Sequence, residues 1–211
     1  ELKMKFSSNL IKEREQTQAT CAHFENVFDK TTCEKIINYC KSNLSFIKGG
    51  IGGSTGGEEV STDIVVKSIR DSDIAWMRNN NDTSFIFKKI IEKTNQINNF
   101  YNFDIVGITE PIQFTSYDGN KEEHFDWHLD MGAGYKSRRK LSLIIQLSDE
   151  NDYEGGECQI EIDARDNKPT IGSRKRGSMI FFPSYLRHRI TPVTSGHRYS
   201  LVSWLSGQPY R

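Results

Sequence analysis

The half of the chain from residue 105 onward consists of short apolar runs separated by turn residues, and this pattern constrains the fold most. Five runs rich in β-branched and aromatic residues cover 112–117, 141–147, 158–162, 179–182 and 199–205. Turn-forming sequences such as Asp118-Gly119-Asn120 separate them. Many short strands at even spacing indicate a sandwich or barrel and not alternating β-α units. We therefore predict an all-β core for this half.

Two helices are expected in the first 104 residues. Thr31-Thr32-Cys33-Glu34 has the pattern of a capping box, and apolar residues follow it at helical spacing as far as Cys40. Residues 84–100 have the pattern of a second, amphipathic helix. Cys33 and Cys40 share a helix face, so we predict that they pack in the core and bind no metal.

The chain around and between these helices is less regular. Residues 24–28 and 63–70 have strand character. Residues 49–57 are rich in Gly and Ser but contain neither GxxxxGK[ST] nor a strand-flanked GxGxxG. This segment is therefore predicted to be a mobile loop and not a phosphate site, and its position ahead of a strand suggests a lid over the substrate.

Composition narrows the class of protein. At 211 residues the chain is expected to be one domain, 1–211, in which 1–104 support a catalytic core of 105–211. Acidic and basic residues balance at 28 each, so no global field attracts nucleic acid or an anionic membrane. The apolar runs are too short to span a bilayer, and the four cysteines lack CxxC spacing. We expect a reduced, soluble, cytoplasmic protein.

Residues 124–130 hold two His-x-Asp pairs, His124/Asp126 and His128/Asp130. Residues two apart on a strand point to one face, so each pair can deliver an imidazole nitrogen and a carboxylate oxygen to one point. We choose His128 and Asp130 because they end the run beside the turn at 132–134, where a ligand pair can face a cavity mouth. His124 and Asp126 remain the alternative.

A third ligand is expected from another strand. Of the remaining histidines, His188 follows a strand-like run, 179–183, whereas His23 and His197 have the setting of surface or packing residues. Two histidines and one carboxylate on one side of a metal leave the other side open, which is the ligand set of non-haem Fe(II) oxygenases. We predict such a site at His128, Asp130 and His188.

Arg198 is the predicted anchor for a co-substrate. The usual electron donor of such iron sites is 2-oxoglutarate, whose distal carboxylate must be held away from the metal, and a guanidinium offers the planar fork that a carboxylate prefers. Ser200 lies two residues further on the same strand face and adds a hydroxyl donor. The apolar residues that follow, as far as Leu205, make this a buried strand.

Together these segments resemble the Fe(II)/2-oxoglutarate oxygenases of the prolyl and lysyl hydroxylase-like group. The resemblance is carried by residues 113–117, 127–130, 140–143, 153–157 and 188–198, with a weaker echo at 70–76. It implies a mainly β fold with a double-stranded β-helix (jelly-roll) core flanked by N-terminal α-helices. It also implies Fe(II) on His128, Asp130 and His188, and 2-oxoglutarate on Arg198.

The same resemblance implies two further contacts of the site. It makes Tyr117 a second hydrogen-bonding contact of 2-oxoglutarate and places Trp204 in the lining of the pocket. The chain departs from the group in two respects: the spacing from Tyr117 to His128 is longer, and Arg198 replaces the lysine of animal prolyl 4-hydroxylases.

The activity implied by the resemblance is a dioxygenase that hydroxylates an unactivated C–H bond and releases succinate and CO2. The expected substrates are O2 and a peptide or protein, proline-rich ones included, with ascorbate as reductant, and peptidyl prolyl 4-hydroxylation is the first choice. An AlkB-type nucleic-acid demethylase is one alternative, but its Arg-x5-Arg pattern is broken here by Trp204. A non-catalytic jelly-roll module, cupin-like or sugar-binding, is another, but it needs no carboxylate anchor such as Arg198.

Overall fold

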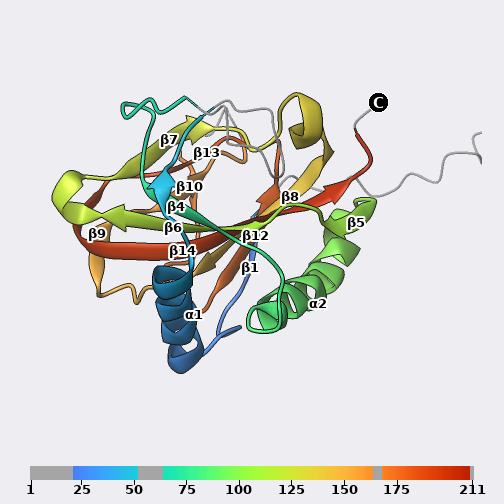
Figure 1. Cartoon of the computed structure of the whole chain (residues 1–211). Coiled ribbons are helices and arrows are strands. Elements are labelled where there is room, and N and C mark those ends of the chain that lie inside the picture. Colours follow the sequence, from blue (N-terminus) through green and yellow to red (C-terminus); the bar gives the residue numbers. More distant parts are fainter. Residues whose placement is uncertain (1–20, 52–63, 164–167, 210–211) are drawn as a thin grey trace, which may run out of the picture.

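The computed structural model describes residues 21–51, 64–163 and 168–209, and these form two facing antiparallel β-sheets with two helices on one side (Figure 1). The larger sheet has the order β1-β12-β8-β14-β6-β4-β2, and β5 and β9 each pair with β14. Its strands are β1 (Ala22–Phe24), β12 (Met179–Pro183), β8 (Arg139–Gln146), β14 (Val193–Gly207), β6 (Ile112–Asp118), β4 (Asp73–Met77), β2 (Ile47–Lys48), β5 (Ile105–Ile108) and β9 (Tyr153–Gly155).

The smaller sheet lies opposite, in the order β11-β10-β13-β7-β3. Its strands are β11 (Thr170–Ile171), β10 (Cys158–Ile160), β13 (His188–Ile190), β7 (His124–His128) and β3 (Arg70–Asp71). Two short 3-10 turns, η1 (Gly119–Lys121) and η2 (Gly134–Arg138), flank β7 on either side along the chain. The smaller sheet is thus assembled from segments that are up to 120 residues apart.

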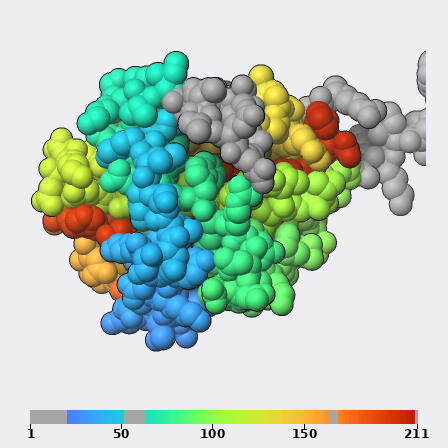
Figure 2. All heavy atoms as spheres, viewed as in Figure 1, coloured from blue at the N-terminus to red at the C-terminus, as the bar shows by residue number. Residues whose placement is uncertain are grey.

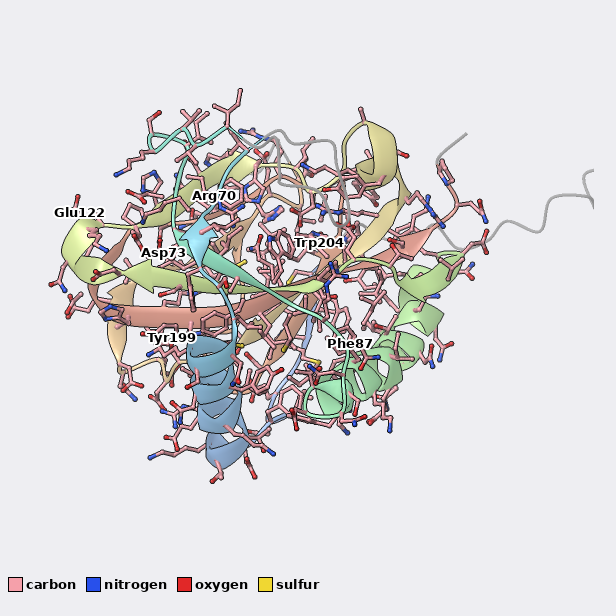
Figure 3. All side chains as sticks on the ribbon, viewed as in Figure 1. Arg70, Asp73, Phe87, Glu122, Tyr199 and Trp204 are labelled. Carbon is pink, nitrogen blue, oxygen red and sulfur yellow. The ribbon has the colours of Figure 1, made fainter. Side chains whose placement is uncertain are left out.

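The larger sheet is buried on both faces, and its side chains divide between two cores. Leu141, Leu143 and Ile145 of β8 join the core formed with helices α1 (Lys30–Asn43) and α2 (Ser84–Tyr101). Ile144 belongs to the core between the two sheets. Strand alternation separates the two sets. Figure 3 shows the same division: Tyr199 lies on the α1 side of the sheet and Trp204 on the other.

Both predicted helices and all five predicted strands of the C-terminal half are present, with ends shifted by a few residues. Helix α2 runs one residue beyond its predicted end. Cys33 and Cys40 are fully buried in the helix-side core, as expected. Figure 2 shows that the N-terminal part of the chain, coloured blue to green, covers much of the face in view.

Three local predictions were wrong. Helix α1 is capped by Asp29, whose carboxylate accepts the Thr32 N–H at 2.7 Å, and not by the capping box that starts at Thr31. The strand predicted at 24–28 ends at Phe24, because the following residues bend and the Phe28 N–H donates to Gly177 O. From Ile64 to Ile69 the chain forms one bridge and a turn with apolar side chains exposed, and strand β3 begins only at Arg70.

The loop predicted at 49–57 lies mostly outside the described residues; of it, Gly49, Gly50 and Ile51 are described, and both glycines are buried. Among the described helices none is long and apolar enough to cross a bilayer.

Candidate metal centre

His128, Asp130 and His188 come together at the inner face of the smaller sheet. His128 ends β7 and is the register partner of His188 on β13, and Asp130 follows two residues after the end of β7. One ligand atom from each residue lies within 4.8 Å of the other two. Nε2 of His188 is 3.4 Å from Asp130 Oδ2, and Nε2 of His128 is 3.8 Å from Asp130 Oδ1. The predicted proximity is therefore present.

Both histidines present Nε2 to this point because Nδ1 is already engaged. Nδ1 of His128 lies 2.8 Å from Asp126 O, and Nδ1 of His188 lies 3.1 Å from Leu186 O. A carbonyl only accepts, so Nδ1 carries the proton and Nε2 keeps its lone pair. Burial, and next the neighbouring His188, lower the pKa of His128 to about 3. His128 is therefore neutral, the form that binds a metal.

Asp130 is held from two sides. Ser142 on β8 donates its hydroxyl to Asp130 Oδ2 at 2.6 Å, and Ser184 Oγ lies 3.0 Å from Ser142 Oγ. Arg139 donates to the main-chain oxygen of Asp130 at 3.1 Å. Burial raises the pKa of Asp130, but His188, His128, the Arg139 guanidinium and the Ser142 hydrogen bond together outweigh it and hold the pKa below its usual range. The carboxylate is thus charged and fixed in orientation.

This donor set fits a divalent transition metal with open positions. A structural zinc site closes with four protein ligands. Here the described residues supply three, two imidazole nitrogens and one carboxylate, with no fourth His, Cys, Asp or Glu in the group. The arrangement matches the ligand types and number that non-haem Fe(II) requires.

The alternative pair does not form such a group. Nδ1 of His124 lies 3.1 Å from Glu122 O, and the Asp126 side chain is 52% exposed, 4.0 Å from Arg189. The cause is a bulge in β7. Phe125 pairs with Ile190 and His128 with His188, so three residues of β7 span two of β13. Strict alternation therefore fails here, and Asp126 points away from His128. The side chains of His23 and His197 are about half exposed, as expected.

Arg198 lies in the interior between the sheets, on the face of β14 that carries Ser200. It is 2% exposed, and its Nη1 donates to Ser200 Oγ at 3.3 Å. Its register partner is Tyr117 on β6, with the guanidinium 5.5 Å from the Tyr117 ring centroid. Among the described residues no carboxylate lies within 4.0 Å of this guanidinium, and its Nε has no hydrogen-bond partner. A buried cation in that state is costly unless an anion joins it.

Gly156 shows how closely the chain passes Arg198. A Cβ at Gly156 would lie 2.9 Å from Arg198 Cδ. The φ angles of Gly155 and Gly156 are +69° and +60°, in the left-handed region that favours glycine. A side chain at Gly156 would therefore displace Arg198.

Trp204 is buried and packs against Arg139, a contact that the sequence did not suggest. Its Nε1 has no hydrogen-bond partner among the described residues, and the Arg139 guanidinium lies 3.6 Å from its ring centroid. Arg139 also forms a bidentate pair with Glu110, in which Nε donates to Oε1 at 2.8 Å and Nη2 donates to Oε2. Arg139, Glu110 and Ser142 were not predicted. Only the polar Ser142 within an apolar strand gave a local signal.

A family model supports this reading of the site. Residues 112–206 match the model described as the 2OG-Fe(II) oxygenase superfamily. The matched range contains all seven residues predicted for the site. It covers slightly less than half of the chain.

Curated relatives match over shorter ranges. A PKHD-type hydroxylase of a Synechococcus species is 39% identical over 83 residues, which are 39% of this chain and 36% of that protein. A PKHD-type hydroxylase of Rhizorhabdus wittichii is 34% identical over 101 residues, 45% of this chain and 42% of that protein. The chain therefore spans less than half the length of the curated relatives it matches.

Solved structures match over nearly the whole chain. A prolyl-4-hydroxylase from Pseudomonas putida superposes with a TM-score of 0.67 at 14% identity, covering 90% of this chain and 94% of that chain. A viral collagen prolyl hydroxylase from Paramecium Bursaria Chlorella virus-1, in a 2OG complex, gives 0.60 at 21% identity, covering 89% and 96%. The predicted fold class, a mainly β jelly roll with helices, is confirmed.

Proposed function

We propose that this chain, whose residues 112–206 match the model of the 2OG-Fe(II) oxygenase superfamily, hydroxylates prolyl residues of a peptide or protein substrate with Fe(II) and 2-oxoglutarate. The observation that carries the proposal is the pairing of two features in one interior. The first is an open group of two histidines and one carboxylate, and the second is a buried Arg198 for which the described residues supply no carboxylate partner. A metal would fill the ligand group, and one carboxylate of a dicarboxylate would pair with Arg198.

Bound iron and 2-oxoglutarate would supply the oxidising chemistry, in which O2 places one oxygen atom on the substrate C–H bond and the other in succinate, with release of CO2. The protein binds and orients these groups. His128, Asp130 and His188 hold one side of the metal and leave the other side for the co-substrate and O2. Ser142 keeps the Asp130 carboxylate turned to that point.

Arg198 receives the distal carboxylate in this proposal. Its planar fork can make two parallel charge-assisted hydrogen bonds, and Ser200 Oγ adds a hydroxyl next to it. Tyr117 lies on the neighbouring strand, and burial raises the pKa of its hydroxyl. The phenol therefore stays protonated at neutral pH and can donate a hydrogen bond to the same carboxylate. Trp204 offers one more buried donor, Nε1.

The prolyl substrate rests on the kinds of protein that this chain resembles. Its curated relatives are called PKHD-type hydroxylases, and the folds it matches include prolyl hydroxylases. One of these, from Trichoplax adhaerens, was solved with a hypoxia inducible factor peptide fragment. Ascorbate is the proposed reductant. The AlkB-type and non-catalytic alternatives have less support, because net charge is zero, Trp204 breaks the Arg-x5-Arg pattern and Arg198 is a ready-made anchor.

Mass spectrometry tests the proposal. Proline-rich peptides are incubated with the protein, Fe(II), ascorbate and 2-oxoglutarate under ¹⁸O2, with Asp130→Ala as the inactive control. We expect the peptide to gain one labelled oxygen on proline, and 2-oxoglutarate to be converted to succinate in equal amount. Succinate without peptide oxidation across a broad peptide panel would contradict the prolyl substrate. No consumption of 2-oxoglutarate at all would contradict the oxygenase itself.

A further inference from the structure

Phe125 and His128 form the closest pair of aromatic rings described in the structure. Their centroids are 3.5 Å apart and their planes differ by 10°, so the phenyl ring lies flat on the imidazole. The Arg70 guanidinium lies 4.4 Å from the same phenyl centroid. Because the imidazole already covers one face of the phenyl ring, the guanidinium covers the other. The three planar groups therefore follow one another as Arg70, Phe125 and His128.

We infer that Arg70 and Phe125 are positioning residues that fix the ring plane of His128 for metal binding. The inference rests on the proposed function, since it takes His128 as a metal ligand. The hydrogen bond from Nδ1 to Asp126 O fixes one point of the imidazole but leaves the ring free to tilt about its bond to Cβ. A flat ring pressed against the imidazole removes that tilt and keeps Nε2 aimed at Asp130.

The bulge in β7 makes this stack possible. Phe125 and His128 are three residues apart and would face opposite sides of a regular strand. Because three residues of β7 span two of β13, both side chains turn to the interior, where His188 and Ile190 of the partner strand also lie. The bulge thus brings a packing residue directly onto a predicted ligand.

Arg70 is itself held in place. It is 6% exposed, and it is the register partner of Phe125 on the adjacent strand β3. Its Nε donates to Ser72 Oγ at 3.1 Å and its Nη1 to Gly50 O at 3.3 Å. A Cβ at Gly49 would lie 2.4 Å from Arg70 Nε, so the guanidinium packs directly on the chain there. Figure 3 shows Arg70 at the level of the smaller sheet. The far end of the stack is therefore rigid.

The same strand provides a matched control. Trp127 has an Arg–aromatic contact of the same kind, with the Arg189 guanidinium 4.8 Å and the Arg187 guanidinium 5.5 Å from its ring centroids. No ring contact joins Trp127 to His128 among the described pairs. Replacing Trp127 therefore removes an aromatic ring and its cation contacts from β7 without touching the predicted ligand.

The test uses Mn(II) alone as a probe, measured by electron paramagnetic resonance or calorimetry on the full chain. Phe125→Leu should raise the dissociation constant for Mn(II) by about tenfold or more, the usual effect of losing a partner that orients a ligand. Phe125→Tyr keeps the ring and should restore affinity to nearly that of the wild type. Trp127→Leu should stay within about twofold of the wild type, because its ring supports no ligand.

Two further variants change the Arg70 end of the stack. Arg70→Met keeps most of the volume but loses the flat cation, and Gly49→Ala pushes on the guanidinium without changing any charge. Both should weaken Mn(II) binding in the same direction as Phe125→Leu, by roughly threefold or more. They keep the test decisive if Phe125→Leu fails to fold.

Thermal unfolding of the metal-free variants separates positioning from simple packing. If Phe125→Leu lowers the metal-free midpoint but binds Mn(II) as tightly as the wild type, Phe125 is only a packing residue and the inference fails. The proposed function would survive that result. If the wild type itself binds no Mn(II) or Fe(II), the metal site fails, and the inference fails with it.

Discussion

Arg198 is the residue whose surroundings are hardest to explain without a ligand. Its guanidinium is almost fully buried, yet the described part of the chain gives it only a serine hydroxyl as a hydrogen-bond acceptor. Buried arginines are normally paired. The neighbouring donors Ser200 and Tyr117 would accompany the same anion.

Arg198→Ala should raise the dissociation constant for 2-oxoglutarate by roughly thirtyfold or more, since truncating one partner of a buried charge pair costs about 2–5 kcal/mol. Arg198→Lys should recover part of the affinity, because an ammonium keeps the charge but loses the fork. Anaerobic calorimetric titration into metal-loaded protein measures both. Metal affinity serves as the control and should not change. Affinity for 2-oxoglutarate equal to that of the wild type in Arg198→Ala would remove Arg198 as the anchor.

At the scale of elements, Lys48 on β2 pairs with carboxylates on or beside three other strands. Its Nζ lies 3.1 Å from Asp71 on β3, 3.0 Å from Asp73 on β4 and 2.9 Å from Glu123, just before β7. Glu123 is fully buried and also accepts the Asp118 N–H at 2.8 Å. Burial lowers the pKa of Lys48, but the three carboxylates outweigh it and raise the pKa above its usual range. These ion pairs therefore join β2, β3, β4 and β7, each of which is too short to be stable alone.

Lys48→Met should lower the free energy of unfolding by about 2 kcal/mol, because hydrogen bonds to charged groups contribute roughly 1.5–3 kcal/mol and the buried Glu123 loses its nearest cation. The raised pKa means that this stability is present below the unfolded-state pKa of about 10.4 and is lost as pH rises through the folded-state value. The difference from the wild type should therefore be constant between pH 6 and pH 9.

Urea unfolding measures this difference. Lys67→Met is the matched control, since Lys67 is 70% exposed and lies 4.0 Å from Asp71, and it should change stability by less than about 0.5 kcal/mol. Equal stability of Lys48→Met and the wild type would mean that the network does not hold these strands.

At the scale of the whole molecule, the sequence predicted the elements better than their assembly. Periodicity located both helices and the five strands of the C-terminal half, because each has a regular apolar pattern of its own. It failed at residues 64–69, where apolar side chains stay exposed, and could not place β3 beside β7, since that pairing joins segments 55 residues apart. The jelly roll itself came from family resemblance.

For the candidate site, too, the sequence predicted individual residues better than the contacts that support them. Ligand types and strand endings led to the prediction of His128, Asp130, His188 and Arg198, and the fold places all four in its interior. The supporting contacts were missed because each depends on a distant strand or on the bulge in β7. Arg139 and Glu110 look like surface residues until the fold pairs them, and Phe125 looks like an ordinary packing residue.

The conversion of 2-oxoglutarate to succinate tests the central claim most directly, when it is measured with Fe(II) and O2 in the wild type and in single alanine variants. We predict turnover in the wild type, none in His128→Ala, Asp130→Ala or His188→Ala, and much of the wild-type rate in His124→Ala and Asp126→Ala. Circular dichroism of each variant excludes loss of the fold as the cause. Activity in His128→Ala together with inactivity in His124→Ala would contradict the assigned metal centre.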